Sequence, residues 1–235
     1  MKNKEFFYLQ YDKINWQNQE KTKINSFVNN FIIQNFISKK EADEIKLFDI
    51  GFGIGFFLQL LEQSLSPSFE NIILEGCEPS QKNYKYFETK KLEHKTFNKT
   101  FLQTETDTKF DFLTAIYVFP HFESDELNNV AQKINYMLNS DGRFILVVAN
   151  EDYLEKKLQE KKDLFIERNN IEFNGKKYEE VLHYSEIPEI GTVIDYNREE
   201  KLYIDLFQAN NFTLKSKEEL DDNGFICTIF VFSKK

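Results

Sequence analysis

The stretch LFDIGFGIGFFLQLL, Leu47 to Leu61, decides the fold. An apolar run reaches an acid, Asp49, and three glycines follow at alternate positions, Gly51, Gly53 and Gly55. Glycine lets the backbone adopt conformations that residues with a Cβ avoid, and it lets a ligand lie against the main chain. The apolar residues after the glycines recur at helical spacing. The stretch therefore predicts a buried strand, a ligand-binding turn and a helix that begins in that turn.

The spacing of the glycines narrows the choice of ligand. A dinucleotide-binding turn has the pattern Gly-x-Gly-x-x-Gly, which would place a glycine where Phe56 stands. A phosphate loop would continue with Gly-Lys-Ser or Gly-Lys-Thr, and neither follows. Asp49 would repel a pyrophosphate, whereas it suits a ligand with an ammonium or sulfonium group. The pattern thus disfavours a nicotinamide-dependent oxidoreductase, which stays as an alternative.

Strand and helix patterns alternate around this stretch. Apolar strand patterns occur at residues 46–50, 70–78, 109–119 and 142–150, with a weaker one in 94–102. Helical patterns occur at residues 54–65, 81–91 and 124–138, the second opened by Ser80 as N-cap and the third ending in the turn Asn-Ser-Asp-Gly. Such alternation predicts an α/β fold with a doubly wound, mostly parallel sheet.

The alternation breaks after Asn150. Residues 151–197 combine a charged helix with strand-like pieces that turn at Asn174-Gly175, which predicts a hairpin insertion. A helix at residues 198–209 and two strands joined at Asn223-Gly224 complete the pattern, and these strands are expected to pair antiparallel. We therefore expect one domain over residues 1–235, with seven strands and an antiparallel last strand.

The N-terminal region, residues 1–40, predicts a helical lid. Apolar residues recur at helical steps within residues 14–36. Tyr8, Tyr11 and Trp16 precede most of that pattern and are expected either to cover the ligand or to pack into the core.

Four segments together resemble the class I S-adenosylmethionine-dependent methyltransferases, of the type that acts on small molecules. They are FDIGFGIG as the glycine loop, EGCEPS as the end of the second strand, KFDFLTAIYVFPHF as the fourth strand, and LNSDGRFILVV as the fifth. The resemblance covers roughly residues 46–149 and implies S-adenosyl-L-methionine as cofactor. In that family the loop glycines approach the cofactor and the acid after the second strand accepts the ribose hydroxyls.

The resemblance also implies where the cofactor lies on this chain. Its methionine portion would lie against Asp49, Gly51, Phe52, Gly53, Gly55 and Tyr117, its ribose against Glu78, and its adenine against Pro79 and Ser80. Gln103, Thr104 and Glu105 are candidates for the adenine amine.

The sequence says less about the residues that would bind the methyl acceptor. His121, just beyond the fourth strand, is a candidate general base, with Glu123 as an alternative and a purely structural histidine as the simpler interpretation. His94 and His183 are expected to be surface or insertion residues. The Asn/Asp-Pro-Pro-Tyr motif of the nucleic-acid and glutamine N-methyltransferases is absent, since YVFPHF stands in its place. We therefore expect methyl transfer to an oxygen or nitrogen of a small molecule, or else a silent cofactor-binding module.

Composition supports these classes. The formal net charge of −9 disfavours binding to long nucleic acids, because such binding needs a cationic face. The sequence contains no run of eighteen apolar residues, so we expect no membrane span. Two cysteines build neither a disulfide framework nor a zinc cluster, and they favour a reducing, cytoplasmic location.

Overall fold

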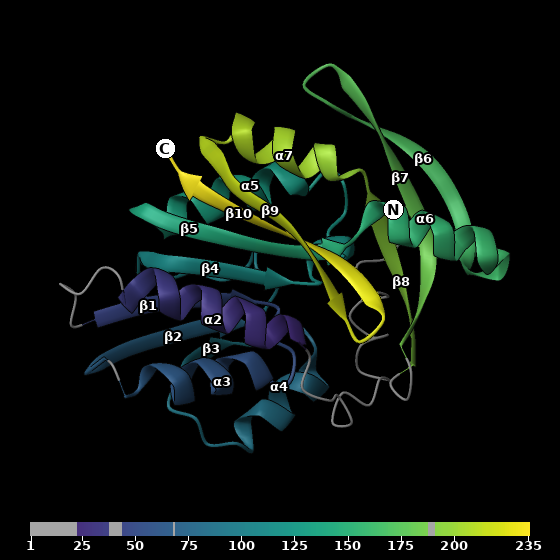
Figure 1. Cartoon of the computed structure of the whole chain (residues 1–235). Helices are drawn as coiled ribbons and strands as arrows, with labels where there is room; N and C mark the ends of the chain where they lie inside the picture. Colours follow the sequence, from purple (N-terminus) through teal and green to yellow (C-terminus); the bar gives the residue numbers. More distant parts are fainter. Residues whose placement is uncertain (1–22, 38–43, 68, 188–190) are drawn as a thin grey trace.

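The computed structural model describes residues 23–37, 44–67, 69–187 and 191–235 (Figure 1). Its main sheet has seven strands in the order β3-β2-β1-β4-β5-β10-β9. These strands are β1 (Glu44–Ile50), β2 (Asn71–Cys77), β3 (Lys95–Phe97), β4 (Phe110–Ile116), β5 (Leu138–Ala149), β9 (Phe212–Asp222) and β10 (Phe225–Lys234). The first five pair in parallel, and β10 runs antiparallel to both β5 and β9. The predicted mostly parallel sheet with an antiparallel last strand is confirmed.

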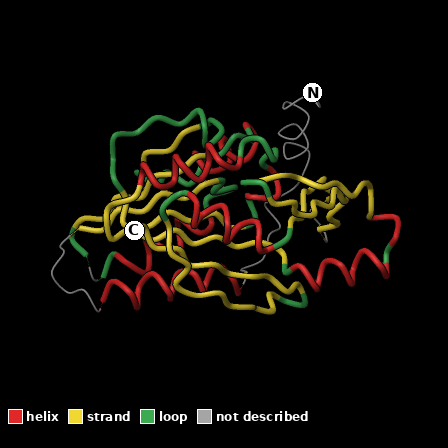
Figure 2. Tube along the Cα trace, turned by 90° about the horizontal axis from the view of Figure 1, so that it is seen from above, coloured by secondary structure: helices red, strands yellow, loops and turns green. Residues whose placement is uncertain are grey.

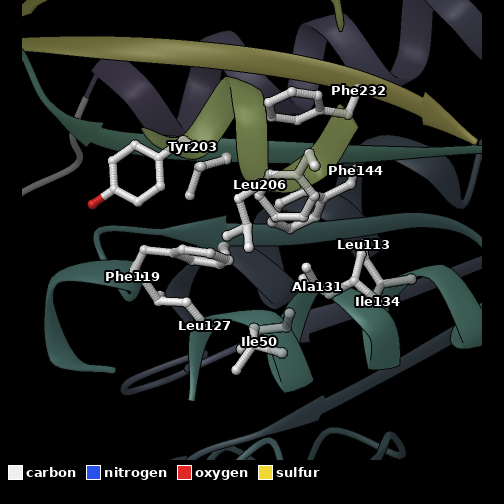
Figure 3. Close-up of a cluster of buried hydrophobic side chains, with 14 of the residues drawn as sticks. Ile50, Leu113, Phe119, Leu127, Ala131, Ile134, Phe144, Tyr203, Leu206 and Phe232 are labelled. Atoms are coloured by element: carbon white, nitrogen blue, oxygen red, sulfur yellow. The ribbon is translucent and has the colours of Figure 1, made fainter. Parts of the chain in front are cut away.

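Helices cover both faces of this sheet, as the view in Figure 2 shows. They are α2 (Lys23–Ile37), α3 (Phe56–Leu65), α4 (Gln81–Glu88), α5 (Leu127–Met137) and α7 (Glu200–Ala209). On one face, α5 and α7 pack on the phenylalanine-rich core of which Figure 3 draws a part, including Phe119, Phe144 and Phe232. On the other face, α2 and α3 pack on alternate residues of the same strands. This two-sided burial explains why the strands read as unbroken apolar runs.

A second, three-stranded sheet stands beside the carboxyl end of β4 (Figure 1). It follows α6 (Glu151–Glu160) and the short helix η3 (Lys162–Leu164), and it contains β6 (Phe165–Phe173), β7 (Lys176–Ile187) and β8 (Gly191–Arg198). The predicted hairpin at Asn174-Gly175 is confirmed, with β6 and β7 antiparallel. Its third strand, β8, was not predicted, and α7 begins at Glu200 rather than at residue 198 because Arg198 belongs to β8.

Two further boundaries differ from the sequence-based expectation. Helix α5 ends at Met137, and β5 begins directly at Leu138 where a turn was expected. The Asn139 amide donates to the Asp111 carboxylate at 2.9 Å where the register shifts: Leu138 pairs with Phe110 and Arg143 with Phe112, so β5 bulges between these two pairs. Helix α2 packs on α3 and on the core of that sheet face, and the expected lid over the ligand stays a prediction. Tyr8, Tyr11 and Trp16 lie outside the described residues. Within the described residues, no helix is both long and apolar enough to cross a membrane.

Candidate active site

A cavity of about 1210 Å³ opens at the carboxyl ends of β1, β2 and β4. Open α/β sheets bind ligands at this edge, where helices diverge to opposite faces. Its walls come from the glycine loop, the end of β2, the short helix η2 (Phe119–His121), strands β7 and β8, and the tip of the β9–β10 hairpin. The cavity exceeds the roughly 300–1,000 Å³ of a common single-ligand pocket. It therefore has room for a cofactor and a second molecule.

The glycine loop has left-handed residues at alternate positions. Gly51, Gly53 and Gly55 have φ angles of 69°, 56° and 74°. A Cβ added to Gly51 would lie 2.7 Å from Val118 Cγ2, whereas one on Gly53 would meet nothing within 4 Å. The main chain at Gly53 thus borders open space, as the close approach of a ligand to the main chain would require.

Gly55 serves a different purpose from Gly53. It is the residue before α3, and a Cβ there would lie 2.1 Å from Phe87 Cδ2. The absence of a side chain lets α3 approach α4 closely. Gly55 does not line the cavity, and its role is to let the loop and α3 pack against Phe87.

Glu78 closes the loop from the neighbouring strand. Its Oε2 accepts from the Gly53 amide at 2.9 Å and its Oε1 from the Ser80 amide at 2.8 Å. Burial raises the pKa of the Glu78 carboxyl to about 7, against the lowering effect of these two hydrogen bonds. Each carboxylate oxygen has a second lone pair, so the group can still accept sugar hydroxyls.

Asp49 is a second buried acid at the end of β1. Its Oδ1 accepts from the Thr114 hydroxyl at 2.6 Å. Burial raises the pKa of the Asp49 carboxyl to about 7, the Thr114 hydrogen bond lowers it, and the nearby Glu78 charge adds to the increase. Two buried acids beside an open backbone suit a ligand that carries hydroxyls and a positive charge.

Most of the predicted cofactor residues meet at this cavity. The lining includes Asp49, Gly51, Phe52, Gly53, Glu78, Pro79, Tyr117 and His121. Ser80 is fully buried, and its hydroxyl accepts from the Asn83 amide as the predicted N-cap of α4. From the segment expected at the adenine amine, the lining contains Thr100 and Phe101 instead of Gln103, Thr104 and Glu105.

Tyr117 turns the chain out of β4. Its φ of 58° is left-handed, which costs a residue with a side chain about 1–2 kcal/mol. Its ring packs edge-on against Phe225 from the β9–β10 hairpin, at 5.5 Å between centroids, and Phe225 packs in turn against Tyr153 of α6. These three rings form one aromatic wall of the cavity.

His121 meets a carboxylate that the sequence did not indicate. Its Nδ1 lies 3.1 Å from Oδ1 of Asp195, on β8 of the inserted sheet. Burial acts to raise the pKa of the Asp195 carboxyl, but the charge and hydrogen bond of His121 prevail and hold that pKa below its ordinary value. A neutral His121 with its proton on Nδ1 would donate to Asp195, and its other ring nitrogen would then be a hydrogen-bond acceptor. Glu123 is not among the lining residues.

The expectation for His94 and His183 was correct only in part: His183 belongs to the insertion, on β7, but neither side chain is exposed. His183 is 3% exposed and lines the cavity, where its Nε2 lies 3.1 Å from the Ser185 hydroxyl. Burial lowers its pKa. The His94 side chain is also mostly buried, with Nε2 3.5 Å from Glu62. The pattern of alternate residues on β7 was the available signal for His183, since it shares a strand face with the buried Val181.

Comparison with known proteins agrees with this geometry. A family model described as a methyltransferase domain matches residues 24–216, so the chain belongs to that family. No curated relative matches the sequence. Among solved structures, a similar one is an S-adenosylmethionine-dependent methyltransferase from Clostridium acetobutylicum, with TM-score 0.58, 16% identity and 98% of each chain covered.

Two further structures are similar. Magnesium protoporphyrin IX methyltransferase from Synechocystis with bound SAH has TM-score 0.61 and 13% identity, with 98% of this chain and 94% of that chain covered. CalS10, an amino pentose methyltransferase from Micromonospora echinaspora, has TM-score 0.58 and 13% identity, with 93% of each chain covered. The chain is a class I S-adenosylmethionine-dependent methyltransferase with a Rossmann-like sheet, and its cofactor is S-adenosyl-L-methionine.

Proposed function

We propose that this methyltransferase transfers the methyl group to an oxygen or nitrogen of a small-molecule acceptor, with His121 as general base. The observation that carries the proposal is the 3.1 Å contact between His121 Nδ1 and Asp195 Oδ1 in the wall of the cavity that contains the glycine loop. The size of the cavity and its aromatic wall support a small acceptor.

The cofactor would be held by the loop and the two buried acids. Gly53 offers an open main-chain surface, and Glu78 lies where it can accept ribose hydroxyls. Asp49 would face the charged methionine portion, Phe52 and Tyr117 would line it, and Pro79 would flank the adenine. When bound, S-adenosylmethionine supplies a methyl group already activated by its sulfonium.

The chain must then align the acceptor and remove its proton. Alignment of two bound molecules converts a bimolecular reaction into a unimolecular one, and exclusion of water prevents competing reactions. His121 would accept the proton of the acceptor hydroxyl or ammonium at Nε2, while Asp195 stabilises the resulting imidazolium. A positive charge on His121 would lower the pKa of the Glu78 carboxyl, so the cofactor and acceptor parts of the site are electrostatically linked.

A screen tests the proposal. Purified protein with S-adenosylmethionine is offered phenols, hydroxy acids and amines, and formation of S-adenosylhomocysteine and of the methylated product is followed by mass spectrometry. With an acceptor found, His121→Asn is expected to lower kcat by about 10²- to 10⁴-fold at neutral pH. His94→Asn is the control, because His94 does not line the cavity. Equal activity of His121→Asn and wild type would contradict the assignment of the base, and absence of turnover across the screen would favour a silent binding module.

A further inference from the structure

Arg198 is the largest fully buried side chain in the described residues and has no part in the chemistry proposed above. It lies at the end of β8 and is 1% exposed. A buried guanidinium is tolerated only when its donors are satisfied. Its Nε donates to Oε2 of Glu180, on β7, at 2.6 Å, so an ion pair joins the edge strand β8 to the central strand of the inserted sheet.

The other donors of Arg198 leave the inserted sheet and reach the turn that carries His121. Nη1 donates to the Phe119 carbonyl at 3.1 Å, and Nη2 donates to the Phe122 carbonyl at 2.6 Å and to the Ser124 hydroxyl at 3.2 Å. The two carbonyls lie on either side of His121 in the sequence. A planar guanidinium can hold both carbonyls in one geometry, which a lysine cannot do.

One strand therefore determines both halves of the His121 geometry. Asp195, three residues before Arg198 on β8, contacts the imidazole of His121. Arg198 binds the backbone carbonyls on either side of that histidine. We infer that Arg198, supported by Glu180, is a positioning residue that keeps His121 against Asp195, so that the inserted sheet is a fixed half of the acid–base site. The inference rests on the proposed role of His121.

This role differs from ordinary stabilisation in a measurable way. Replacement of both partners of a buried ion pair by apolar residues of similar volume is often neutral or stabilising, whereas removal of one partner leaves an unpaired buried charge. The paired variant Arg198→Met/Glu180→Leu is therefore expected to fold and to bind S-adenosylhomocysteine like wild type, while His121 loses its fixed position.

The test reads the imidazole of His121 directly. The chain has three histidines, so the ¹⁵N signals of His121 can be assigned from the spectrum of His121→Asn. In wild type the neutral ring is expected as the Nδ1–H tautomer, because that proton is donated to Asp195. In the paired variant the Nε2–H tautomer, which a histidine side chain free in water prefers, is expected to appear. The control is Arg168→Met/Glu179→Leu, which removes an ion pair of the same sheet with no contact to residues 119–124.

Activity supplies a second reading once an acceptor is known. The paired variant should lose about 10- to 100-fold in kcat with little change in KM, because a small misplacement of a catalytic group has effects of that size. Arg198→Lys keeps a cation beside Glu180 and replaces the paired variant if that one does not fold. A retained Nδ1–H tautomer in the variant that folds overturns the inference. The tautomer does not depend on turnover, so this failure is distinct from a failure of the proposed function.

Discussion

Substitution of Gly55 by alanine should destabilise the fold through one identifiable clash. Gly55 and Gly175 both have a φ of +74°, so alanine at either position is strained by about 1–2 kcal/mol. At Gly55 the new Cβ would also lie 2.1 Å from Phe87 Cδ2, whereas at Gly175 it would meet nothing within 4 Å. Overpacking of a filled core costs about 1–3 kcal/mol. We therefore expect a loss of about 1–2 kcal/mol for Gly175→Ala and about 2–5 kcal/mol for Gly55→Ala.

Urea unfolding followed by circular dichroism measures both losses, with the free energy of unfolding extrapolated to water. A double-mutant cycle then identifies the clash: Phe87→Ala removes the ring carbons that the new Cβ would meet, and it should recover about 1–3 kcal/mol in the Gly55→Ala background relative to its effect in wild type. Equal losses for Gly55→Ala and Gly175→Ala, or a coupling free energy near zero with Phe87→Ala, would refute the reasoning that Gly55 is needed for helix packing.

Other predictions follow from the same contacts. Because burial raises the pKa of Glu78 to about 7 in the folded state, the folded protein binds the extra proton, and stability should fall as pH rises from about 4.5 to about 7. Glu78→Gln should remove up to about 3 kcal/mol of that decline in ligand-free thermal unfolding, and an unchanged pH dependence would contradict it. Asp222→Ala should cost about 1–2 kcal/mol in urea unfolding, because Asp222 Oδ1 accepts from the Lys23 amide at the start of α2, and no loss would contradict this capping role. Gly51→Ala should bind S-adenosylhomocysteine more weakly in calorimetry, with partial recovery by Val118→Ala, since its Cβ would lie 2.7 Å from Val118; no recovery would argue against the clash.

The sequence was most informative where a residue type answers a local backbone requirement. Three glycines at alternate positions predicted the left-handed loop, and Ser80 predicted the cap of α4, because both are determined by neighbours in the chain. The parallel pairing of the first five strands followed from their alternation with helices. Gly55 was assigned to the ligand because a spacing pattern does not distinguish a glycine that faces a cavity from one that faces a phenylalanine.

The acceptor side could not be predicted, because its residues meet across long separations. Asp195 reaches His121 from a strand of the inserted sheet and lies 74 positions further along the chain. Arg198 looked like the start of a helix because the apolar pattern of α7 begins just after it. Arginine is rarely fully buried, so a sequence pattern does not predict a buried one. Only the tertiary structure shows the carbonyls that accept its hydrogen bonds.

The central claim is that this cavity binds S-adenosylmethionine through the glycine loop. Isothermal titration calorimetry with S-adenosylmethionine and S-adenosylhomocysteine tests it most directly, with NAD as the comparison ligand and Gly53→Arg as the variant. The side chain of Gly53→Arg would enter the open space beside the main chain of the loop. We predict single-site binding of both adenosyl ligands by wild type, loss of that binding in the folded variant, and no binding of NAD. Absence of binding by folded wild type, or equal binding by Gly53→Arg, would contradict the claim.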